Sequence, residues 1–233
     1  MPGSARAEIL ETIARALKRA ARPESLCVES SRNLDQIVLE IRRKCERRRD
    51  KLIEQFESEL QKAGARFHRA SDGDSVVEHI LQIASVRQTR TAISWDTEPF
   101  NGIDMAGKLE KNGIRVITEA SCDAFIQRAA SADLGVSGVD HAIADTGTLV
   151  LLARTGQARS VSLLPPVHIA IVRPGQILSS LDDLFPVLRH EGNGELASAV
   201  TLITGPSRTA DIELTLVVGV HGPQELHVVL LDS

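Results

Sequence analysis

Residues 65–138 decide the fold class, and they read ARFHRASDGDSVVEHILQIASVRQTRTAISWDTEPFNGIDMAGKLEKNGIRVITEASCDAFIQRAASADLGVSG. Short apolar segments alternate along this stretch with segments whose apolar residues recur at helical spacing. The predicted strands are 65–68, 89–94, 114–117 and 133–138, and the predicted helices are 75–86, 103–111 and 123–130. Such alternation is typical of βαβ units, so we expect a parallel sheet with helices on both faces.

Strands dominate the chain after residue 139, and helices dominate it before residue 64. The predicted later strands are 148–153, 168–172, 199–203 and 226–231, with one clear helix at 179–189. Apolar residues at helical spacing also predict a helix over 5–19 and a longer one from residue 33 to Gly64. We therefore expect an α/β domain over 65–233, with a mixed, largely parallel sheet flanked by helices, and a helical N-terminal extension over 1–64.

The composition is that of an ordinary globular protein with little attraction for polyanions. The chain has 233 residues and a formal net charge of -4, which predicts weak binding to DNA and to anionic lipid. The aromatic content of 3% argues against a base-stacking surface. No apolar run approaches the roughly 20 residues of a membrane-spanning helix, and we identify no signal peptide. The sequence thus predicts a cytoplasmic protein that binds neither nucleic acid nor membrane.

Metal and cofactor motifs are missing from the sequence. The cysteines Cys27, Cys45 and Cys122 are widely spaced, whereas an iron–sulfur cluster normally needs about four thiolates. We therefore expect no cluster in this chain, and no metal site, because the histidines lack a close ligand spacing. The P-loop, the dinucleotide-binding glycine motif and the nucleophile elbow of serine hydrolases are absent too.

A basic run crosses the second predicted helix, with seven cations between residues 42 and 51. One interpretation is a face that binds an anion or a partner protein. The alternative, which is the commoner outcome for such a run, is a solvated face whose cations pair with nearby acids such as Glu40, Glu46 and Glu54.

Ligands of open α/β sheets bind beyond the carboxyl ends of the strands, and three segments have suitable residues. The first is 144–148, Ala-Asp-Thr-Gly-Thr. Asp145 is a candidate acid or base, Thr146 and Thr148 can donate to a carboxylate or phosphate, and Gly147 permits close backbone approach. The alternative is a turn that only leads into a strand, with Asp145 bonded to local backbone.

The second segment is 205–213, Gly-Pro-Ser-Arg-Thr-Ala-Asp-Ile-Glu, after the strand predicted at 199–203. A glycine followed by hydroxyl and basic residues at a helix start suits an anion, and Arg208 has the fork geometry for a carboxylate or phosphate. The anion-binding candidates here are Gly205, Ser207, Arg208 and Thr209. Asp211 and Glu213 reduce the positive field, and Glu213 is a further acid or base candidate. Functional and structural interpretations are about even.

The third segment is 219–223, in which His221 stands between Gly219 and Gly222. A histidine in such a loop can act as a general base, or bind an anion when protonated. The commoner alternative is a loop histidine without a chemical role. His141 and His168 are weaker candidates.

Four segments, in this order and spacing, resemble the LUD domain family, and most closely its LutC type. They are 144–148 (ADTGT), 165–169 (PPVHI), 205–213 (GPSRTADIE) and 219–228 (GVHGPQELHV). The resemblance covers residues 65–231 and is strongest after residue 139, and the helical extension is similar to the LutC type as well. Asp145 departs from the glutamate expected in much of the family, which shortens the reach of this carboxylate.

The resemblance implies a fold similar to the group that contains ribose-phosphate isomerase, coenzyme A transferases and formyltetrahydrofolate cyclo-ligase. It also implies a place in a three-component bacterial system that oxidises L-lactate to pyruvate. In that system LutA-like and LutB-like partner subunits carry the iron–sulfur clusters, which agrees with the absence of cluster ligands here. The oligomeric state is left open.

Two functions follow from the resemblance, and fold similarity cannot choose between them. The first is an accessory or regulatory subunit of the iron–sulfur assembly, with a site for a small anionic ligand or a partner's segment. The second is a stand-alone isomerase-, transferase- or cyclo-ligase-like enzyme acting on an anionic small molecule, with Asp145, Glu213 or His221 as its acid or base. A third alternative is that the three loops serve the fold alone.

Overall fold

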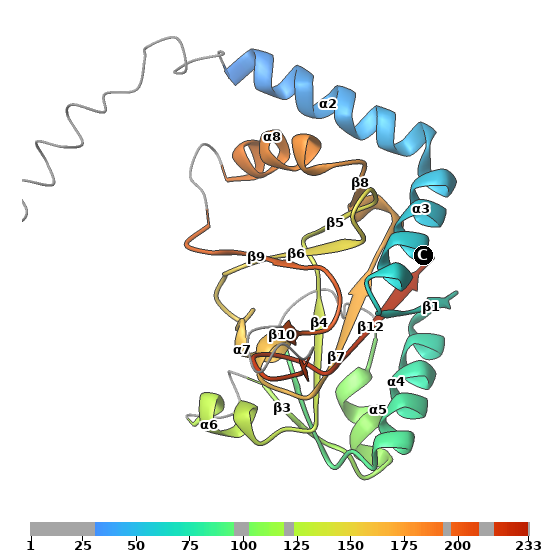
Figure 1. Cartoon of the computed structure of the whole chain (residues 1–233), viewed down its shortest axis with the longest axis vertical. Coiled ribbons are helices and arrows are strands. Elements are labelled where there is room, and N and C mark those ends of the chain that lie inside the picture. Colours follow the sequence, from blue (N-terminus) through green and yellow to red (C-terminus); the bar gives the residue numbers. More distant parts are fainter. Residues whose placement is uncertain (1–30, 96–102, 119–123, 193–196, 210–216, 233) are drawn as a thin grey trace, which may run out of the picture.

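The computed structural model describes residues 31–95, 103–118, 124–192, 197–209 and 217–232 of the chain. Within these ranges the strands form one six-stranded sheet, one four-stranded sheet and a short two-stranded hairpin. Figure 1 shows the larger sheet below the smaller one, with helices on the outer sides of both.

The larger sheet has the strand order β1-β12-β7-β4-β2-β3, and all of its pairings are parallel. Its strands are Arg66–Ala70 (β1), Thr91–Ser94 (β2), Arg115–Ile117 (β3), Leu134–Gly138 (β4), Val167–Val172 (β7) and Glu225–Leu231 (β12). The helices between the first four of these strands are Gly73–Arg87 (α4), Met105–Lys111 (α5) and Phe125–Ala130 (α6). The βαβ alternation predicted for residues 65–138 is therefore confirmed.

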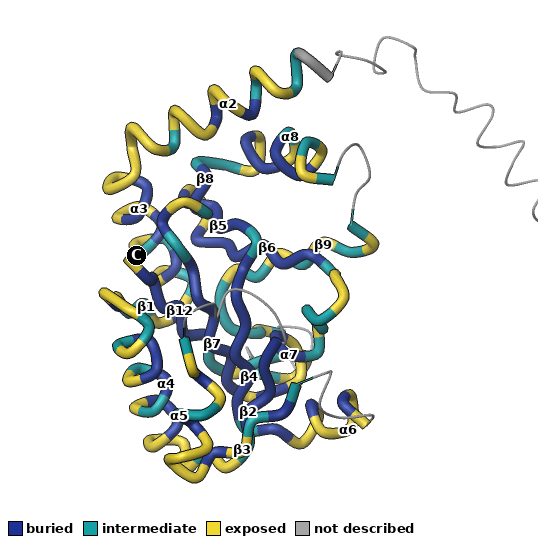
Figure 2. The backbone as a smooth tube through the Cα atoms, turned by 180° about the vertical axis from the view of Figure 1, so that it is seen from behind, coloured by how far each residue is buried: buried dark blue, intermediate teal, exposed yellow. Residues whose placement is uncertain are grey.

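The strands of the larger sheet are buried on both faces, as is usual for parallel strands. Along β12, Val228 and Leu230 belong to one core, while Val229 and Leu231 belong to the other. Helices α4 and α5 cover the second core. The first core is covered by α6, by Arg49–Lys62 (α3), by Ser160–Leu163 (α7) and by the smaller sheet. In Figure 2 the central strands are accordingly dark blue, and yellow residues lie on the outer turns of the helices.

The smaller sheet has the order β8-β5-β6-β9 and mixes parallel with antiparallel pairings. Its strands are His141–Ile143 (β5), Thr148–Leu152 (β6), Ile177–Leu178 (β8) and Val200–Ile203 (β9). Two helices, Ser31–Arg47 (α2) and Leu181–Glu191 (α8), cover the face of this sheet that points away from the main core. The predicted mixed, largely parallel sheet flanked by helices is confirmed, with the antiparallel pairings confined to the second sheet and the hairpin.

The single helix predicted from residue 33 to Gly64 is wrong, because the backbone leaves the helical conformation at Arg48. The break allows α2 to lie on α8 while α3 turns into the main core. Helix α3 ends at Lys62, and Gly64 stops it as predicted, two residues further on, with a φ of +92° that favours glycine. It buries four side chains: Leu52, Ile53, Phe56 and Leu60. The division of the chain at residue 64 stays a prediction, and the helix predicted over 5–19 lies outside the described residues.

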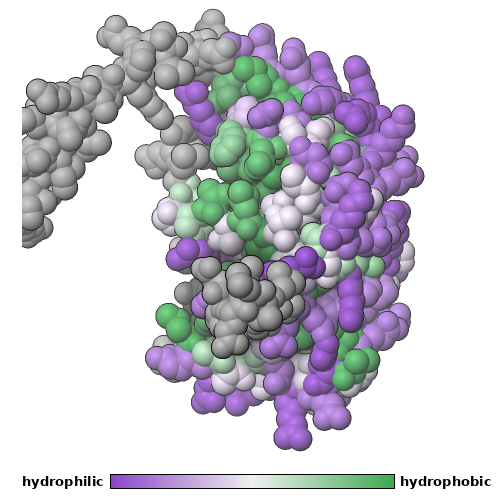
Figure 3. Space-filling model, viewed as in Figure 1, coloured by the Kyte–Doolittle hydropathy of each residue, from purple (hydrophilic) through white to green (hydrophobic). Residues whose placement is uncertain are grey.

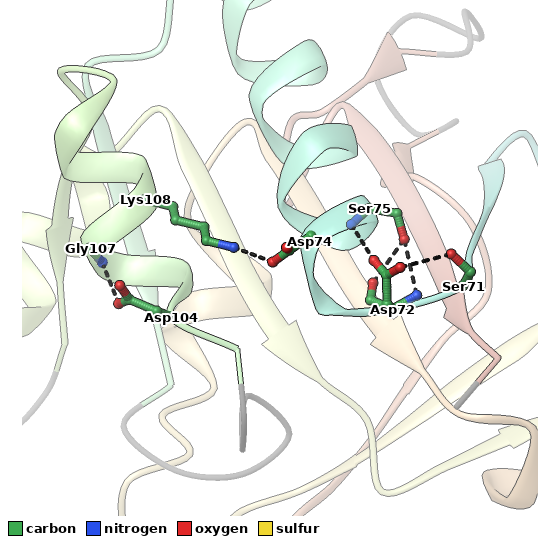
Figure 4. Close-up of polar contacts among 7 residues, drawn as sticks. All are labelled: Ser71, Asp72, Asp74, Ser75, Asp104, Gly107 and Lys108. Atoms are coloured by element: carbon green, nitrogen blue, oxygen red, sulfur yellow. Dashed lines mark hydrogen bonds and ion pairs between the residues drawn. The ribbon is translucent and has the colours of Figure 1, made fainter.

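Short polar side chains start the helices that cover the outer face of the larger sheet (Figure 4). At the start of α4, Asp72 accepts from the backbone N–H of Ser75 at 2.8 Å, and Ser75 Oγ accepts from the backbone N–H of Asp72 at 3.1 Å. This capping box satisfies two donors that the first helical turn leaves without partners. Asp104 caps α5 in a similar way. Lys108 of α5 pairs with Asp74 of α4 and so joins the two helices.

Candidate functional site

A cavity of about 580 Å³ lies where the break between α2 and α3 faces α8. Arg42 and Arg43 line it from α2, and Arg49 lines it from α3. The segment 174–178, which follows β7, forms a further wall, and Glu191 at the end of α8 completes the lining on that side. The helix break at Arg48 therefore helps to form the cavity.

A second cavity of about 440 Å³ adjoins the first. The two share four lining residues: Asp140, His141, Gln176 and Glu191. In the second cavity Trp95 comes directly after β2, Asp140 comes two residues after β4, and Arg173 comes directly after β7. Both cavities thus lie beyond the carboxyl ends of parallel strands. In the larger sheet β3 lies on one side of β2 and β4 lies on the other, so the direction in which successive strands are added reverses beside β2. Open α/β sheets bind ligands at the carboxyl ends of the strands at such a reversal.

Asp140 is the most enclosed charged group of this region, with only 6% of its side chain exposed. Its carboxylate accepts from the backbone N–H of Leu152 on β6 at 2.7 Å and pairs with Arg154 at 2.6 Å. Burial raises the pKa of Asp140 above its usual value, although both contacts act in the opposite direction. Asp140 therefore joins the carboxyl end of β4 to the smaller sheet and fixes a guanidinium at the wall of the second cavity.

His141 and Glu191 form the second polar contact of the site. His141 Nε2 lies 3.0 Å from Glu191 Oε2, and Glu191 Oε1 accepts from Arg42 at 3.4 Å. Burial opposes ionisation of Glu191, but the hydrogen bond from His141 and the charges of His141 and Arg42 outweigh it, so its pKa is lowered. A carboxylate held beside an imidazole can orient that imidazole for proton transfer.

Gln176 holds the loop after β7 against the loop after β4. Its amide nitrogen donates to the carbonyl of Val139 at 2.6 Å, and its amide oxygen accepts from the backbone N–H of Arg173 at 2.7 Å. These bonds keep two strand ends together at the centre of the site. The geometry of the cavities is thus set by backbone contacts as well as by ion pairs.

The arrangement combines arginines, which suit carboxylates and phosphates, with two groups able to exchange protons, His141 and Asp140. The described residues contain no group of three or more His, Cys, Asp or Glu side chains that could hold a metal ion. Binding of an organic anion is therefore the chemistry that these side chains support most directly.

The predicted loop 144–148 is the hairpin turn between β5 and β6 of the smaller sheet. Asp145 and Thr146 are exposed, whereas Thr148 is buried. The hydroxyl of Thr148 bonds to that of Thr146 at 2.8 Å and to that of Thr204 at 2.7 Å. Gly147 has a φ of +62° and packs directly on the backbone of Leu60 in α3.

The described part of the predicted loop 205–213, which is residues 205–209, also lies against the end of α3. The guanidinium of Arg208 donates to the carbonyl of Ala63 at 2.9 Å, and Gly205 packs on the same residue. Arg208–Thr209 form strand β10, which pairs with Val217–Val218 (β11), so the helix start expected in this segment is wrong. Glu213 lies outside the described residues.

The predicted loop 219–223 leads into the amino end of β12. Gly219 donates to the carbonyl of Ser207 at 2.9 Å, and Ser207 donates to the carbonyl of Pro223 at 2.9 Å. Gly222 packs beside Ser207. His221 is exposed and makes no hydrogen bond or ion pair with any described residue.

Residues 144–148 and 205–209 thus both lie against the carboxyl end of α3, and residues 219–223 bond to the 205–209 segment. The first two segments follow β5 and β9 of the smaller sheet, and the third leads into the amino end of β12. Our expectation that the loops lie beyond the carboxyl ends of the strands of the parallel sheet is therefore wrong. None of their described residues lines the two cavities. The catalytic and anion-binding roles assigned to them stay predictions.

Sequence reasoning missed most of the residues around the cavities. Trp95 and Arg173 directly follow predicted strands, so the strand-end rule, if applied to every strand, would have selected both. Arg154 directly follows the strand predicted at 148–153, so the same rule would have selected it too, although that strand belongs to the smaller sheet. Glu191 carries no such signal, because it comes from the end of a helix. Of the residues that the two cavities share, only His141 was named as a candidate, and as a weak one.

The fold and the site define an α/β protein with an arginine-lined cavity at the carboxyl ends of its parallel strands. A protein of the DUF162 family from Deinococcus radiodurans has a similar solved structure, with a TM-score of 0.57 and 23% identity over 78% of this chain and 98% of that one. At this identity the likeness concerns the fold. None of the helices in the described part of the chain is long and apolar enough to cross a membrane.

Residues 53–231 match the sequence profile of the LUD domain, and the chain belongs to the LUD domain family. Lactate utilization protein C of Halalkalibacterium halodurans is 34% identical over 152 residues, which are 64% of this chain and 65% of that protein. The match thus spans slightly less than two thirds of that relative. Lactate utilization protein C of Macrococcus caseolyticus is 34% identical over 162 residues, or 69% of each chain. The predicted family resemblance is confirmed.

Proposed function

We propose that this protein serves lactate utilisation as the component without an iron–sulfur cluster, beside LutA-like and LutB-like partners that carry the clusters. Its role there is accessory or regulatory, and the two cavities at the strand ends are its site for a small anionic ligand. The observation that carries the proposal is the agreement between relatives named for lactate utilisation and an arginine-lined cavity at the place where this sheet type binds ligands.

The partner interaction is tested by co-purification and by growth. The tagged full chain is expressed with the LutA-like and LutB-like proteins of the same genome, and a deletion strain is grown on L-lactate as sole carbon source. We expect the three proteins to co-purify, and L-lactate oxidation to fall at least tenfold in the deletion strain. A deletion strain that oxidises L-lactate normally, together with a chain that retains neither partner, would reject the proposal.

The cavity is tested in the same strain by complementation. Arg154→Met removes the cation that Asp140 holds at the cavity wall, whereas Arg115→Met removes an exposed arginine of β3 that lies outside both cavities. We expect Arg115→Met to restore oxidation fully and Arg154→Met to restore less than about a tenth of it, as for loss of an interaction of about 1.4 kcal/mol or more. Circular dichroism and thermal melting of both variants check that they fold.

A second function is favoured by one specific contact, the His141–Glu191 pair beside Asp140. Such a set could serve a stand-alone enzyme of the isomerase, transferase or cyclo-ligase type acting on an organic anion. The purified chain would then turn over a sugar phosphate, a coenzyme A ester or a folate without partners. His141→Gln should abolish this turnover and His221→Gln should leave it intact, whereas the reverse pattern would place the acid or base in the 219–223 loop.

A further inference from the structure

The two cavities are large for the acid after which the relatives are named. Their volumes are about 580 Å³ and about 440 Å³, and they meet at the shared residues Asp140, His141, Gln176 and Glu191. Pockets of about 300–1,000 Å³ generally enclose ligands of drug or cofactor size. A three-carbon acid such as lactate would fill a small part of either cavity and leave most of its lining in water.

The charges around the cavities are complementary to a dianion. Among the described residues, five arginines line them against three acids: the arginines are Arg42, Arg43, Arg49, Arg154 and Arg173, and the acids are Glu46, Asp140 and Glu191. Leaving His141 out of the count, the formal excess is therefore two positive charges. A monoanion would neutralise only half of this excess.

The acids pair with some of these arginines more closely than with others. The pair between Asp140 and Arg154 is close, at 2.6 Å, but Arg42 lies 3.4 Å from Glu191 and Arg49 lies 3.5 Å from Glu46. Arg42 and Arg49 are half-exposed, so these long ion pairs hold them weakly.

Arg43 makes no ion pair or hydrogen bond with any described residue, although it lines the larger cavity. Three guanidinium groups on the wall formed by α2 and α3 can thus turn to a ligand, and guanidinium groups bind phosphate and carboxylate oxygens in pairs.

We propose that the two cavities form one site for an organic dianion larger than lactate, with a phosphate monoester or a pair of carboxylates held by Arg42, Arg43 and Arg49. The rest of the ligand extends past His141 toward Trp95. This inference rests on the proposed function only in treating the cavities as a ligand site, and it does not depend on the partner proteins. It makes the protein a sensor or carrier of a second metabolite within a lactate-utilising system.

The chain contains its own reporter for this site. Trp95 is the only tryptophan of the sequence, which also has no tyrosine. It is 5% exposed, lines the second cavity, and donates through Nε1 to the carbonyl of Ala158 at 3.3 Å. A ligand that fills the cavities should therefore change the emission of Trp95, and isothermal titration calorimetry measures the same binding independently.

The experiment titrates the full chain with AMP, ribose 5-phosphate, succinate, L-lactate and adenosine. We expect at least one of the dianions to bind saturably, with a Kd at least tenfold lower than that of L-lactate, and adenosine not to bind. Saturation by AMP or ribose 5-phosphate assigns the dianion to a phosphate ester, and saturation by succinate alone assigns it to a dicarboxylate. Absence of binding by all three dianions, or equally tight binding of L-lactate, overturns the proposal.

A matched pair of variants locates the binding. Arg43→Met removes a cavity arginine whose loss leaves no described acid without its partner, and Arg47→Met removes an exposed arginine one turn further along α2 that does not line the cavities. The Kd for the bound dianion should rise at least tenfold in Arg43→Met and stay unchanged in Arg47→Met. Equal affinities in the two variants would place the ligand elsewhere. Co-purification with the partners is measured separately, so failure of ligand binding and failure of the proposed function are distinguishable.

Discussion

Gly147 is the residue through which the 144–148 turn packs on α3. A β-carbon at this position would overlap the backbone of Leu60, and the φ of +62° is unfavourable for any side chain. We expect Gly147→Ala to lower the free energy of unfolding by more than about 2 kcal/mol, because neither backbone can move alone. Urea denaturation followed by circular dichroism measures the change.

Two other glycines separate the causes of that loss. Gly113 has a φ of +79° but open space around it, and Gly175 has open space without a positive φ. Gly113→Ala should therefore lower the free energy of unfolding by about 1 kcal/mol, through the backbone conformation alone. Gly175→Ala should change it by less than about 0.5 kcal/mol. If Gly147→Ala were no worse than Gly113→Ala, the close packing of the turn on α3 would be refuted.

Arg208 stabilises the carboxyl end of α3 in the described structure. Its guanidinium donates to the carbonyl of Ala63, where the helix dipole is negative. Arg208→Met should lower the stability by about 1 kcal/mol, the usual worth of such a bond at an exposed position. Arg115→Met, at an exposed arginine of β3 whose side chain makes no described hydrogen bond or ion pair, serves as the control and should change little. Equal stability of the two variants would mean that Arg208 does not stabilise the end of α3, which would favour the anion-binding role predicted from sequence.

Among the elements, α2 depends on its contact with α8 for its position. Val38 and Ile41 of α2 are buried with Leu184, Val187 and Leu188 of α8, whereas Leu39 is 48% exposed. The cations of the ion pairs between the two helices are about half-exposed, as in the pair of Lys44 with Asp183, so these pairs add little. Apolar packing therefore holds the helix that carries the cavity arginines.

This packing predicts a difference between two neighbouring substitutions in α2. Ile41→Ala should lower stability by about 2–4 kcal/mol, or release α2 locally, whereas Leu39→Ala should cost less than about 1 kcal/mol. Hydrogen exchange of the α2 amides detects a local release that global unfolding would miss. Similar exchange rates for both variants would mean that α2 is held by other contacts.

The distribution of polar and apolar side chains on the surface follows the arrangement of the helices. Figure 3 shows hydrophilic side chains over the outer side of the molecule, where α2, α3 and α4 lie. Apolar side chains gather in the region where α2 and α8 cover the smaller sheet. Of the basic run, Arg43, Arg47, Arg48 and Lys51 make no described ion pair, while Arg42, Lys44 and Arg49 each pair with an acid. The predicted pairing of the basic run with acids thus holds for three of its cations and not for the other four.

For the whole molecule, buried histidines predict a stability that falls in mild acid. Burial lowers the pKa of His168 to about 3, and burial with nearby charges lowers those of His68 and His227 to about 4. His68 Nε2 lies 3.1 Å from His227 Nδ1, and the two rings stack at 5.4 Å between centroids. A proton on either ring would therefore be repelled by a proton on the other.

The sign of this pH dependence follows from the lowered pKa values. Below about pH 6.5 the unfolded chain takes up protons that the folded chain refuses, so stability falls as the pH drops from about 6.5 toward 4. His168, which is fully buried, alone contributes up to about 1.4 kcal/mol per pH unit in this window. Urea midpoints between pH 7.5 and 4.5 measure the slope. His168→Asn should flatten it, and an unchanged slope would show that His168 takes up its proton in the folded state.

Local sequence patterns were enough for the elements of the larger sheet. Segments rich in Val, Ile and Leu, such as 168–172 and 226–231, have a clear β pattern, and 75–86 has a clear helical one, because each side chain reflects mainly the face on which it lies. The strands β5 and β8 were missed because three and two residues are too few to show a period. The break at Arg48 was missed because the apolar stripe continues through it, first toward α8 and then toward the main core.

The sequence by itself determined the α/β class, the family, and the absence of motifs for a P-loop or a dinucleotide site. Only the tertiary structure decided where the motif loops lie, since Gly147 and Gly205 serve close packing on the end of α3 and do not line the strand-end cavities. It also decided the candidate site, because Asp140, Arg154 and Glu191 come from β4, β6 and α8. Their meeting depends on how two sheets and two helices pack, and a linear pattern records only the neighbours of each residue along the chain.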